Sequence, residues 1–163
     1  MEIIRERRSI ARLVSRLNRV PESAIALLAR LSIALTFWLS GQTKIDGLVI
    51  DPIGWHLQLG IPHISDGAIE LFRSEYALPL LPPELAASMA AIAEHVFPMM
   101  LLLGLATRLS AFALLTMTLV IQTFVYPLAY PTHLLWATLM LYLIARGPGS
   151  LSLDHLIARH ARR

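Results

Sequence analysis

The sequence predicts an all-α integral membrane protein: a four-transmembrane-helix bundle with amphipathic surface helices. Two observations lead to this class. Hydrophobic residues make up 56% of the 163 residues and the mean hydropathy is +0.61, too apolar for an ordinary soluble domain of this size. The apolar residues gather in four long runs, and none alternates strictly as a barrel strand does, so helices are the spanning elements. The length suits a single membrane domain, 1–163, rather than two.

The four spans are expected at about 22–41, 83–105, 109–126 and 132–145. At 1.5 Å per residue the second is about 34 Å long, enough to cross the hydrocarbon core. The fourth is short and is expected to begin within the interface at Pro131. The first resembles a signal peptide, but its basic leader is long and LSGQTK lacks a small-x-small cleavage pattern, so we interpret it as an uncleaved span.

Basic residues predict the orientation. Because arginine and lysine favour the cytoplasmic side, both termini are expected in the cytoplasm and loop 42–82 outside. Apart from Arg30, which lies within the first span, the side expected to be external carries only two basic residues, Lys44 and Arg73. The side expected to be cytoplasmic carries Arg5, Arg7, Arg8, Arg12, Arg16, Arg19, Arg108, Arg146, Arg159, Arg162 and Arg163.

Three amphipathic segments are expected on the surface. The basic leader 1–20 suits an interfacial helix over 2–19. A helix over 66–76 follows Ser65 as N-cap and places Ile69, Phe72 and Tyr76 on one face. The tail 146–163 repeats the pattern with Leu153, Leu156 and Ile157. Loop 45–62, with its glycines and prolines, is expected to be irregular but compact.

Composition also excludes function classes. The chain has no cysteine, which removes dithiol chemistry, iron–sulfur clusters and thiolate-bound metals. The net charge of +3 comes from arginines at the chain ends beside apolar spans, which favours a membrane surface over nucleic acid as a partner. The histidines do not form a convincing metal or haem set, and the methionines after His95 are best explained by packing.

Glu94 and His95 are the first candidate site. They lie near the middle of the second span, where an ionisable pair is costly and usually functional. The alternative is a polar pair that only holds the bundle in register. Arg30 on the first span is the natural charge partner of Glu94, although it can equally snorkel to the cytoplasmic surface. Pro98 removes a hydrogen-bond donor to the carbonyl of Glu94.

A second polar layer is expected near the outer surface. Gln42 and Lys44 follow the first span, Gln122 lies on the third and His133 on the fourth. Hydrogen-bond donors at the mouth of a bundle, above a midplane acid, are typical of a pocket for a quinone or another small lipophilic ligand. Nearby Tyr126 is more simply explained as part of an aromatic belt.

The order of these features resembles the DoxX family of small bacterial four-span membrane proteins. The residues that carry the resemblance are ARLSIALTFWLSGQTKI at 29–45, LFRSEYALPLLPPELAA at 71–87, AEHVFPMMLLLGLATRLSA at 93–111 and LVIQTFVYPLAYPTHLLWATLMLYLIARGPGSLSLDHL at 119–156. The resemblance implies a multi-pass protein of the bacterial inner (plasma) membrane, often a partner of redox or sulfur-metabolising proteins. The family name comes from a subunit of a thiosulfate:quinone oxidoreductase. The resemblance does not supply catalytic residues.

Three functions are compatible with these features. The first is a membrane subunit of a redox-associated complex, with Glu94 and His95 catalytic and with Arg30, Gln42, Lys44, Gln122 and His133 binding quinone or a similar ligand. The second is a non-enzymatic anchor or assembly partner for an extracytoplasmic protein that docks on loop 42–82. The third is a transporter, which four short spans without an inverted repeat disfavour unless the chain forms a homodimer. Whether the chain is itself catalytic stays open.

Overall fold

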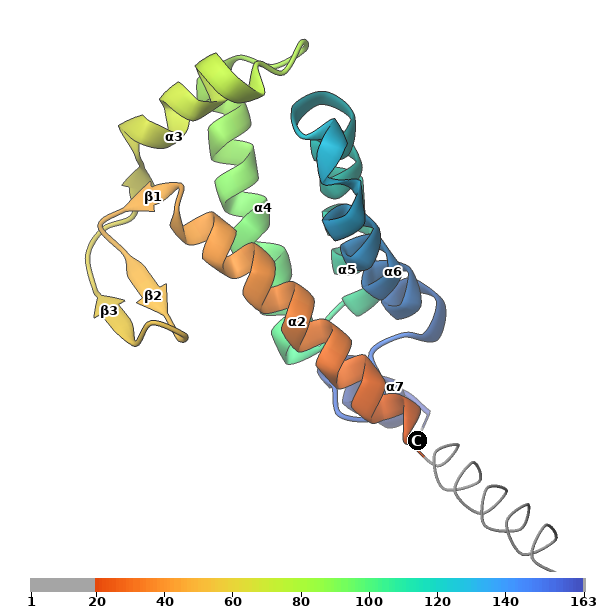
Figure 1. The fold of residues 1–163 in the computed structure, drawn as a ribbon. Helices are drawn as coiled ribbons and strands as arrows, with labels where there is room; N and C mark the ends of the chain where they lie inside the picture. The colour runs from red at the N-terminus through yellow and green to blue at the C-terminus, as the bar shows by residue number, and fades with distance from the viewer. Residues whose placement is uncertain (1–19, 163) are drawn as a thin grey trace, which may run out of the picture.

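The computed structural model describes residues 20–162, and the fold is drawn in Figure 1. The leader helix expected over 2–19 lies outside the described residues. The remaining chain forms four long helices: α2 (Glu22–Gln42), α4 (Pro83–Leu103), α5 (Thr107–Val120) and α6 (Tyr130–Arg146). A π-helical turn (Ile121–Val125) prolongs α5, and a 3₁₀ turn (Pro127–Ala129) precedes α6. All four are long and apolar enough to span a membrane, which confirms the predicted fold class.

The ends of these helices differ by a few residues from the expected spans, for local reasons. Helix α4 ends at Leu103 because Gly104 adopts a left-handed conformation, with φ of +66°, that closes the last turn onto Met100 and Leu101. It continues through Pro98 as one helix. Helix α5 begins at Thr107, immediately after another left-handed residue, Ala106. The left-handed pair thus makes the tight turn between the second and third spans.

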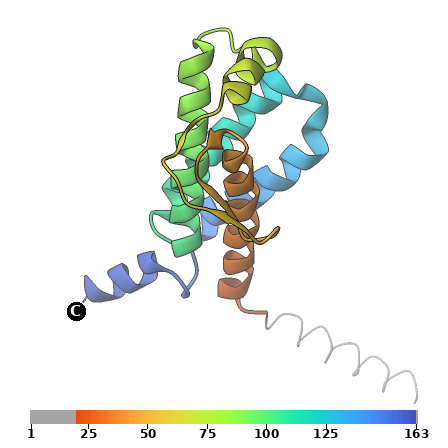
Figure 2. The ribbon, with the colours of Figure 1, turned by 90° about the vertical axis from the view of Figure 1, so that its left-hand side faces the viewer.

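The bundle packs α2 against α4 and α5 against α6, with further contacts between α4 and α5 and between α2 and α6 (Figure 1). The side chains at its centre are fully buried and mostly apolar; they include Ile33, Leu101, Leu114, Met140 and Leu143. Four passes bring residues 20 and 162 to the same end, as the turned view in Figure 2 shows. We call this the tail end, and the opposite end, with residues 43–82, the hairpin end.

Loop 45–62 is more regular than expected, so that expectation was wrong. Strand β1 (Ile45–Asp46) pairs with β4 (His63–Ile64), and β2 (Val49–Asp51) pairs with β3 (His56–Gln58), both antiparallel. The Asp51 carboxylate accepts from the amides of Ile53 and Gly54, 2.9 and 2.8 Å away, and closes the turn between β2 and β3. The glycines and prolines therefore bound short strands instead of preventing them.

The two predicted surface helices within the described residues are present. Ser65 caps α3 (Asp66–Leu71) by accepting from the Ala68 amide, and a π-helical turn, η1 (Phe72–Tyr76), continues it. Phe72 is buried and Tyr76 half-buried. At the tail end, Ser152 caps α7 (Leu153–His160), whose leucines and isoleucine are exposed. Both segments thus confirm the one-sided patterns in the sequence.

Candidate functional site

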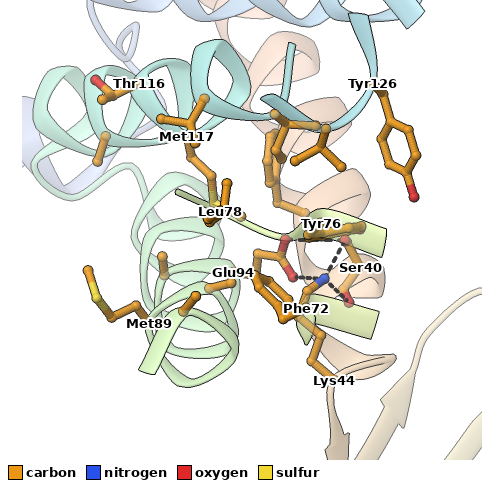
Figure 3. Close-up of a pocket in the computed structure, with 18 of the residues that line it drawn as sticks. Ser40, Lys44, Phe72, Tyr76, Leu78, Met89, Glu94, Thr116, Met117 and Tyr126 are labelled. Carbon is orange, nitrogen blue, oxygen red and sulfur yellow. Dashed lines mark hydrogen bonds and ion pairs between the residues drawn. The ribbon is translucent and has the colours of Figure 1, made fainter. Parts of the chain in front are cut away.

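A buried ion pair joins α4 to the residues that follow α2. Lys44 Nζ lies 2.7 Å from Glu94 Oε2, and the two side chains are only 5% and 2% exposed. Ser40 bridges the pair: its hydroxyl donates to Glu94 Oε1 at 3.3 Å and accepts from Lys44 Nζ at 3.1 Å (Figure 3). At 2.7 Å, the Nζ–Oε2 contact has the length of a charge-assisted hydrogen bond, and Ser40 provides a second contact to the carboxylate. The buried charge of Glu94 is therefore paired.

Local sequence brings these groups together. Lys44 lies two residues after the end of α2. Its side chain folds back over the last turn of the helix and donates to the Ser40 carbonyl at 3.2 Å. Gly41 lets α4 approach, since a Cβ there would lie 2.8 Å from His95 Cε1 and 3.0 Å from Glu94 Cβ. Alanines at 87 and 91, on the Glu94 face of α4, are also buried. Small residues on both helices therefore let α2 and α4 pack closely beside Glu94.

The ion pair lies on the wall of a cavity of about 420 Å³ near the hairpin end, which we call the Glu94 cavity. Its other walls are mostly apolar. Helix α5 contributes Met117 and Val120, and η1 with the following loop contributes Phe72, Tyr76 and Leu78. Figure 3 shows Glu94, Lys44 and Ser40 on one side of this space and Met117 on another. Such a site combines apolar walls with a few convergent polar groups, as small-molecule pockets do.

His95, the neighbour of Glu94, does not line this cavity. Its Nδ1 lies 2.7 Å from the Ala91 carbonyl, which can only accept, so Nδ1 carries the proton. Its Nε2 then accepts from the Gln42 amide at 2.8 Å, and Gln42 Oε1 accepts from the Ile50 amide at 2.6 Å. His95 and Gln42 therefore connect α4 to the end of α2 and to β2.

Arg30 lies elsewhere, and its expected pairing with Glu94 is wrong. The guanidinium donates to the carbonyls of Leu101, at 3.4 Å, and Leu151. Ten residues of helix separate Arg30 from Ser40, about 15 Å, which is too far for the side chain to bridge. It points toward the tail end, as the snorkelling alternative required, but it is buried instead of reaching the surface. Within the part of the chain that the structure describes, its Nε has no hydrogen-bond partner.

The two remaining sequence candidates form a separate contact. His133 Nδ1 lies 2.7 Å from Gln122 Oε1, and Gln122 Nε2 donates to the Pro127 carbonyl at 2.7 Å. Gln122 therefore uses its donor within the chain, whereas the His133 side chain lines the cavity. Of the seven candidate residues, the cavity receives Glu94, Lys44 and His133; the structure places Arg30, Gln42, His95 and Gln122 outside it.

Sequence reasoning missed Ser40 and the tyrosines that border the cavity. Tyr126 donates to the Glu75 carboxylate, and the Tyr76 and Tyr126 rings meet edge to face with centroids 5.6 Å apart. The hydrogen bond to Glu75 raises the pKa of Tyr126, and burial raises that of Tyr76. The spacing of Ser40 and Lys44, four residues apart, was a usable signal for the first contact. Nothing local links Tyr126 to Glu75. Within residues 20–162, His, Asp and Glu do not cluster as three or more potential metal ligands.

Four apolar helices with a buried ion pair beside an apolar cavity define a small multi-pass helical membrane protein. The DoxX family model matches residues 25–127, so the chain belongs to the DoxX family. The chain is also 28% identical over 144 residues to a Haemophilus influenzae protein described as an uncharacterized protein, covering 82% of this chain and 83% of that one. No solved structure matches it significantly. The family match ends before α6, so His133 lies beyond it.

Proposed function

We propose that this protein is the membrane subunit of a redox-associated complex and that the Glu94 cavity binds a quinone or another small lipophilic ligand. One observation carries the proposal: a buried Lys44–Glu94 pair faces a mostly apolar cavity of about 420 Å³. A bundle that needed only to span the membrane would not keep an acid there, since this costs roughly 2.5–3.5 kcal/mol on insertion scales.

The residues have distinct roles in this proposal. Lys44 would donate to a ligand oxygen, because its ammonium already faces the cavity wall beside Ser40. Glu94 would accept or supply a proton, with Ser40 as its hydrogen-bonded neighbour. His95 is a weaker candidate as direct proton partner, because both ring nitrogens contact groups outside the cavity. A bound quinone would supply the electron-accepting chemistry, and a partner protein of a redox or sulfur-metabolism complex would supply the electrons.

The orientation belongs to the same proposal. We place the chain in a bacterial inner membrane with both termini cytoplasmic, because the tail end carries Arg108, Arg146, Arg159 and Arg162. Reporter fusions after residues 60 and 162 decide this directly. An external signal from the second fusion would reverse the orientation.

The ligand is tested on purified protein. We expect lipid extraction and absorption spectra to identify a co-purified quinone, at close to one per chain, that Glu94→Gln and Lys44→Gln lose. Glu84→Gln is the matched control, since Glu84 lies on the same helix but is exposed and outside the cavity. Equal quinone content in the unmodified protein and all three variants would refute the proposal. So would a Glu94→Leu variant that is more stable than the unmodified protein and equally active in a quinone-reduction assay.

A second candidate function has its own supporting observation. The hairpin of β2 and β3 and the segment after it expose large apolar side chains, with Trp55 92% and Ile61 88% exposed. Such a surface suits a protein that docks on the hairpin end, which would make the chain an anchor or assembly partner. A photocrosslinker at Trp55 should then capture one defined protein in cells, and Leu57→Asp should abolish that product. Capture of lipid alone would count against this role.

A further inference from the structure

A second hollow lies at the tail end, outside the Glu94 cavity. It is a groove of about 810 Å³, which we call the tail groove. The start of α5, the end of α6, the loop 148–150 and one side of α7 line it. Its charged side chains are mostly basic: Arg108, Arg146, Arg162 and His155, with Asp154 as the acid. The start of α5, the end of α6 and the segment from α7 onward therefore contribute cations to one space.

The acid in the groove is already engaged. The Asp154 carboxylate accepts from the amides of Ala106 and Thr107, at 2.7 and 2.9 Å. These amides open α5, so the helix dipole and two hydrogen bonds offset the negative charge. Asp154 therefore already has partners, and three arginines against this one acid leave the groove with a net positive charge.

The arginines are not strongly occupied by other partners. Arg146 lies 3.6 Å from Glu22, but both side chains are well exposed, at 63% and 72%, so this pair contributes little. Arg108 is exposed, and among residues 20–162 its one hydrogen bond is a long contact, 3.5 Å, to the Ala145 carbonyl. The guanidinium groups can therefore turn toward an anion at small cost, and their planar forks suit phosphate oxygens.

The surroundings favour an amphiphilic ligand over a free anion. Leu109 lines the groove and is exposed, and Phe112, one turn further into the span, is exposed too. Helix α7 has two opposite faces at 100° per residue: Asp154, His155 and Ala158 line the groove, whereas Leu153, Leu156 and Ile157 are exposed on the other face. Arg162, in the turn just after α7, also lines the groove. An interfacial helix with this pattern lies where head groups meet acyl chains.

We propose that the tail groove binds the phosphodiester head group of an anionic phospholipid. The arginines at 108, 146 and 162 contact the phosphate, and the apolar surface of the spans beside Leu109 contacts the acyl chains. Basic hollows between membrane helices bind anionic head groups in this manner. The bound lipid connects the starts and ends of three helices at the tail end. The site is independent of the proposed quinone site.

Native mass spectrometry of delipidated protein tests this site. The probe is an equimolar mixture of phosphatidylglycerol and phosphatidylcholine with the same acyl chains. Because an arginine near a membrane surface contributes roughly a fivefold preference, we expect phosphatidylglycerol adducts to exceed phosphatidylcholine adducts at least about fivefold. Arg108→Gln with Arg162→Gln should remove most of this preference. Arg159→Gln is the matched control, since Arg159 lies on α7, three residues before Arg162, but does not line the groove.

Further measurements separate the remaining explanations. The thermal melts of all variants are compared first, and Arg146→Gln, at an exposed position, replaces the double variant if that unfolds. Inorganic phosphate at millimolar concentration should neither displace the lipid nor raise the melting temperature. If phosphate alone reproduces the arginine-dependent stabilisation, the groove binds free anions and the proposal is overturned. Equal adducts of both lipids, or equal loss in Arg159→Gln, overturn it as well.

Discussion

Two buried cations lie at opposite ends of the contact between α2 and α4, and they are held differently. Lys44, at the hairpin end, pairs with the Glu94 carboxylate and faces a cavity. Arg30, toward the tail end, donates to two backbone carbonyls, and a Cβ on Gly104 would clash with its guanidinium. Carbonyl partners cannot change their charge, whereas a carboxylate can gain a proton or a ligand. Arg30 therefore has partners of fixed charge, whereas the partner of Lys44 is a group whose charge can change.

The largest effect should come from breaking the ion pair on one side only. Lys44→Leu leaves Glu94 buried without its cation, and we expect it to lower the free energy of unfolding by about 3–5 kcal/mol. The double variant Lys44→Leu with Glu94→Leu should recover most of that loss, because no charge then remains buried. Thermal melts in detergent measure both. A double variant as unstable as the single one would mean that Lys44 acts through packing instead of charge.

Arg30 should behave in the opposite way. Arg30→Met removes donors from the Leu101 and Leu151 carbonyls and should cost about 2–4 kcal/mol. Because more than 10 Å of helix separates the sites, this loss should add to that of Lys44→Leu. It should also expose the segment around Leu151 to limited proteolysis. Arg159→Met, on the surface of α7, is the control and should change stability by less than about 0.5 kcal/mol.

A smaller change at Gly41 sharpens the comparison at the hairpin end. Gly41→Ala places a methyl group 2.8 Å from the His95 ring and 3.0 Å from Glu94 Cβ, so α2 and α4 must separate. We expect a cost of about 1–3 kcal/mol and weaker binding in the Glu94 cavity. Gly67→Ala is the matched control, since nothing lies within 4 Å of its Cβ position. If both variants melt alike, the close approach at Gly41 is unimportant.

The smallest effect is expected at the tyrosine that borders the cavity. Tyr126→Phe loses the hydrogen bond to Glu75 at a partly exposed position and should cost about 0.5 kcal/mol. Because folding raises the pKa of Tyr126, its contribution is fully present below the ordinary tyrosine pKa of about 10 and fades as the pH rises through the higher folded value. Melts of both proteins between pH 7 and 11 measure this. A difference that grows with pH would contradict the assignment.

The sequence was sufficient for the fold but only partly for the site. Long apolar runs predict the four spans, because a segment in the bilayer must satisfy its backbone hydrogen bonds within its own helix. Ser65 predicts α3, because an N-cap is a local interaction. The Arg30 assignment failed because position along a helix gives depth, not the neighbouring side chain. Gln42 and Gln122 were interpreted as free donors, whereas the His95 ring and the Pro127 carbonyl take those donors. Contacts that depend on loop geometry have no local signal.

The bonds at the tail end also bear on how the protein is made. Asp154 binds amides 48 and 47 residues earlier in the chain, and Leu151 accepts from Arg30, 121 residues earlier. At about 5–20 residues per second, the ribosome supplies Asp154 several seconds after Ala106. Until then the opening amides of α5 lack this cap and the guanidinium of Arg30 lacks one of its acceptors. The tail end is therefore completed late in biogenesis, after all four spans have been synthesised.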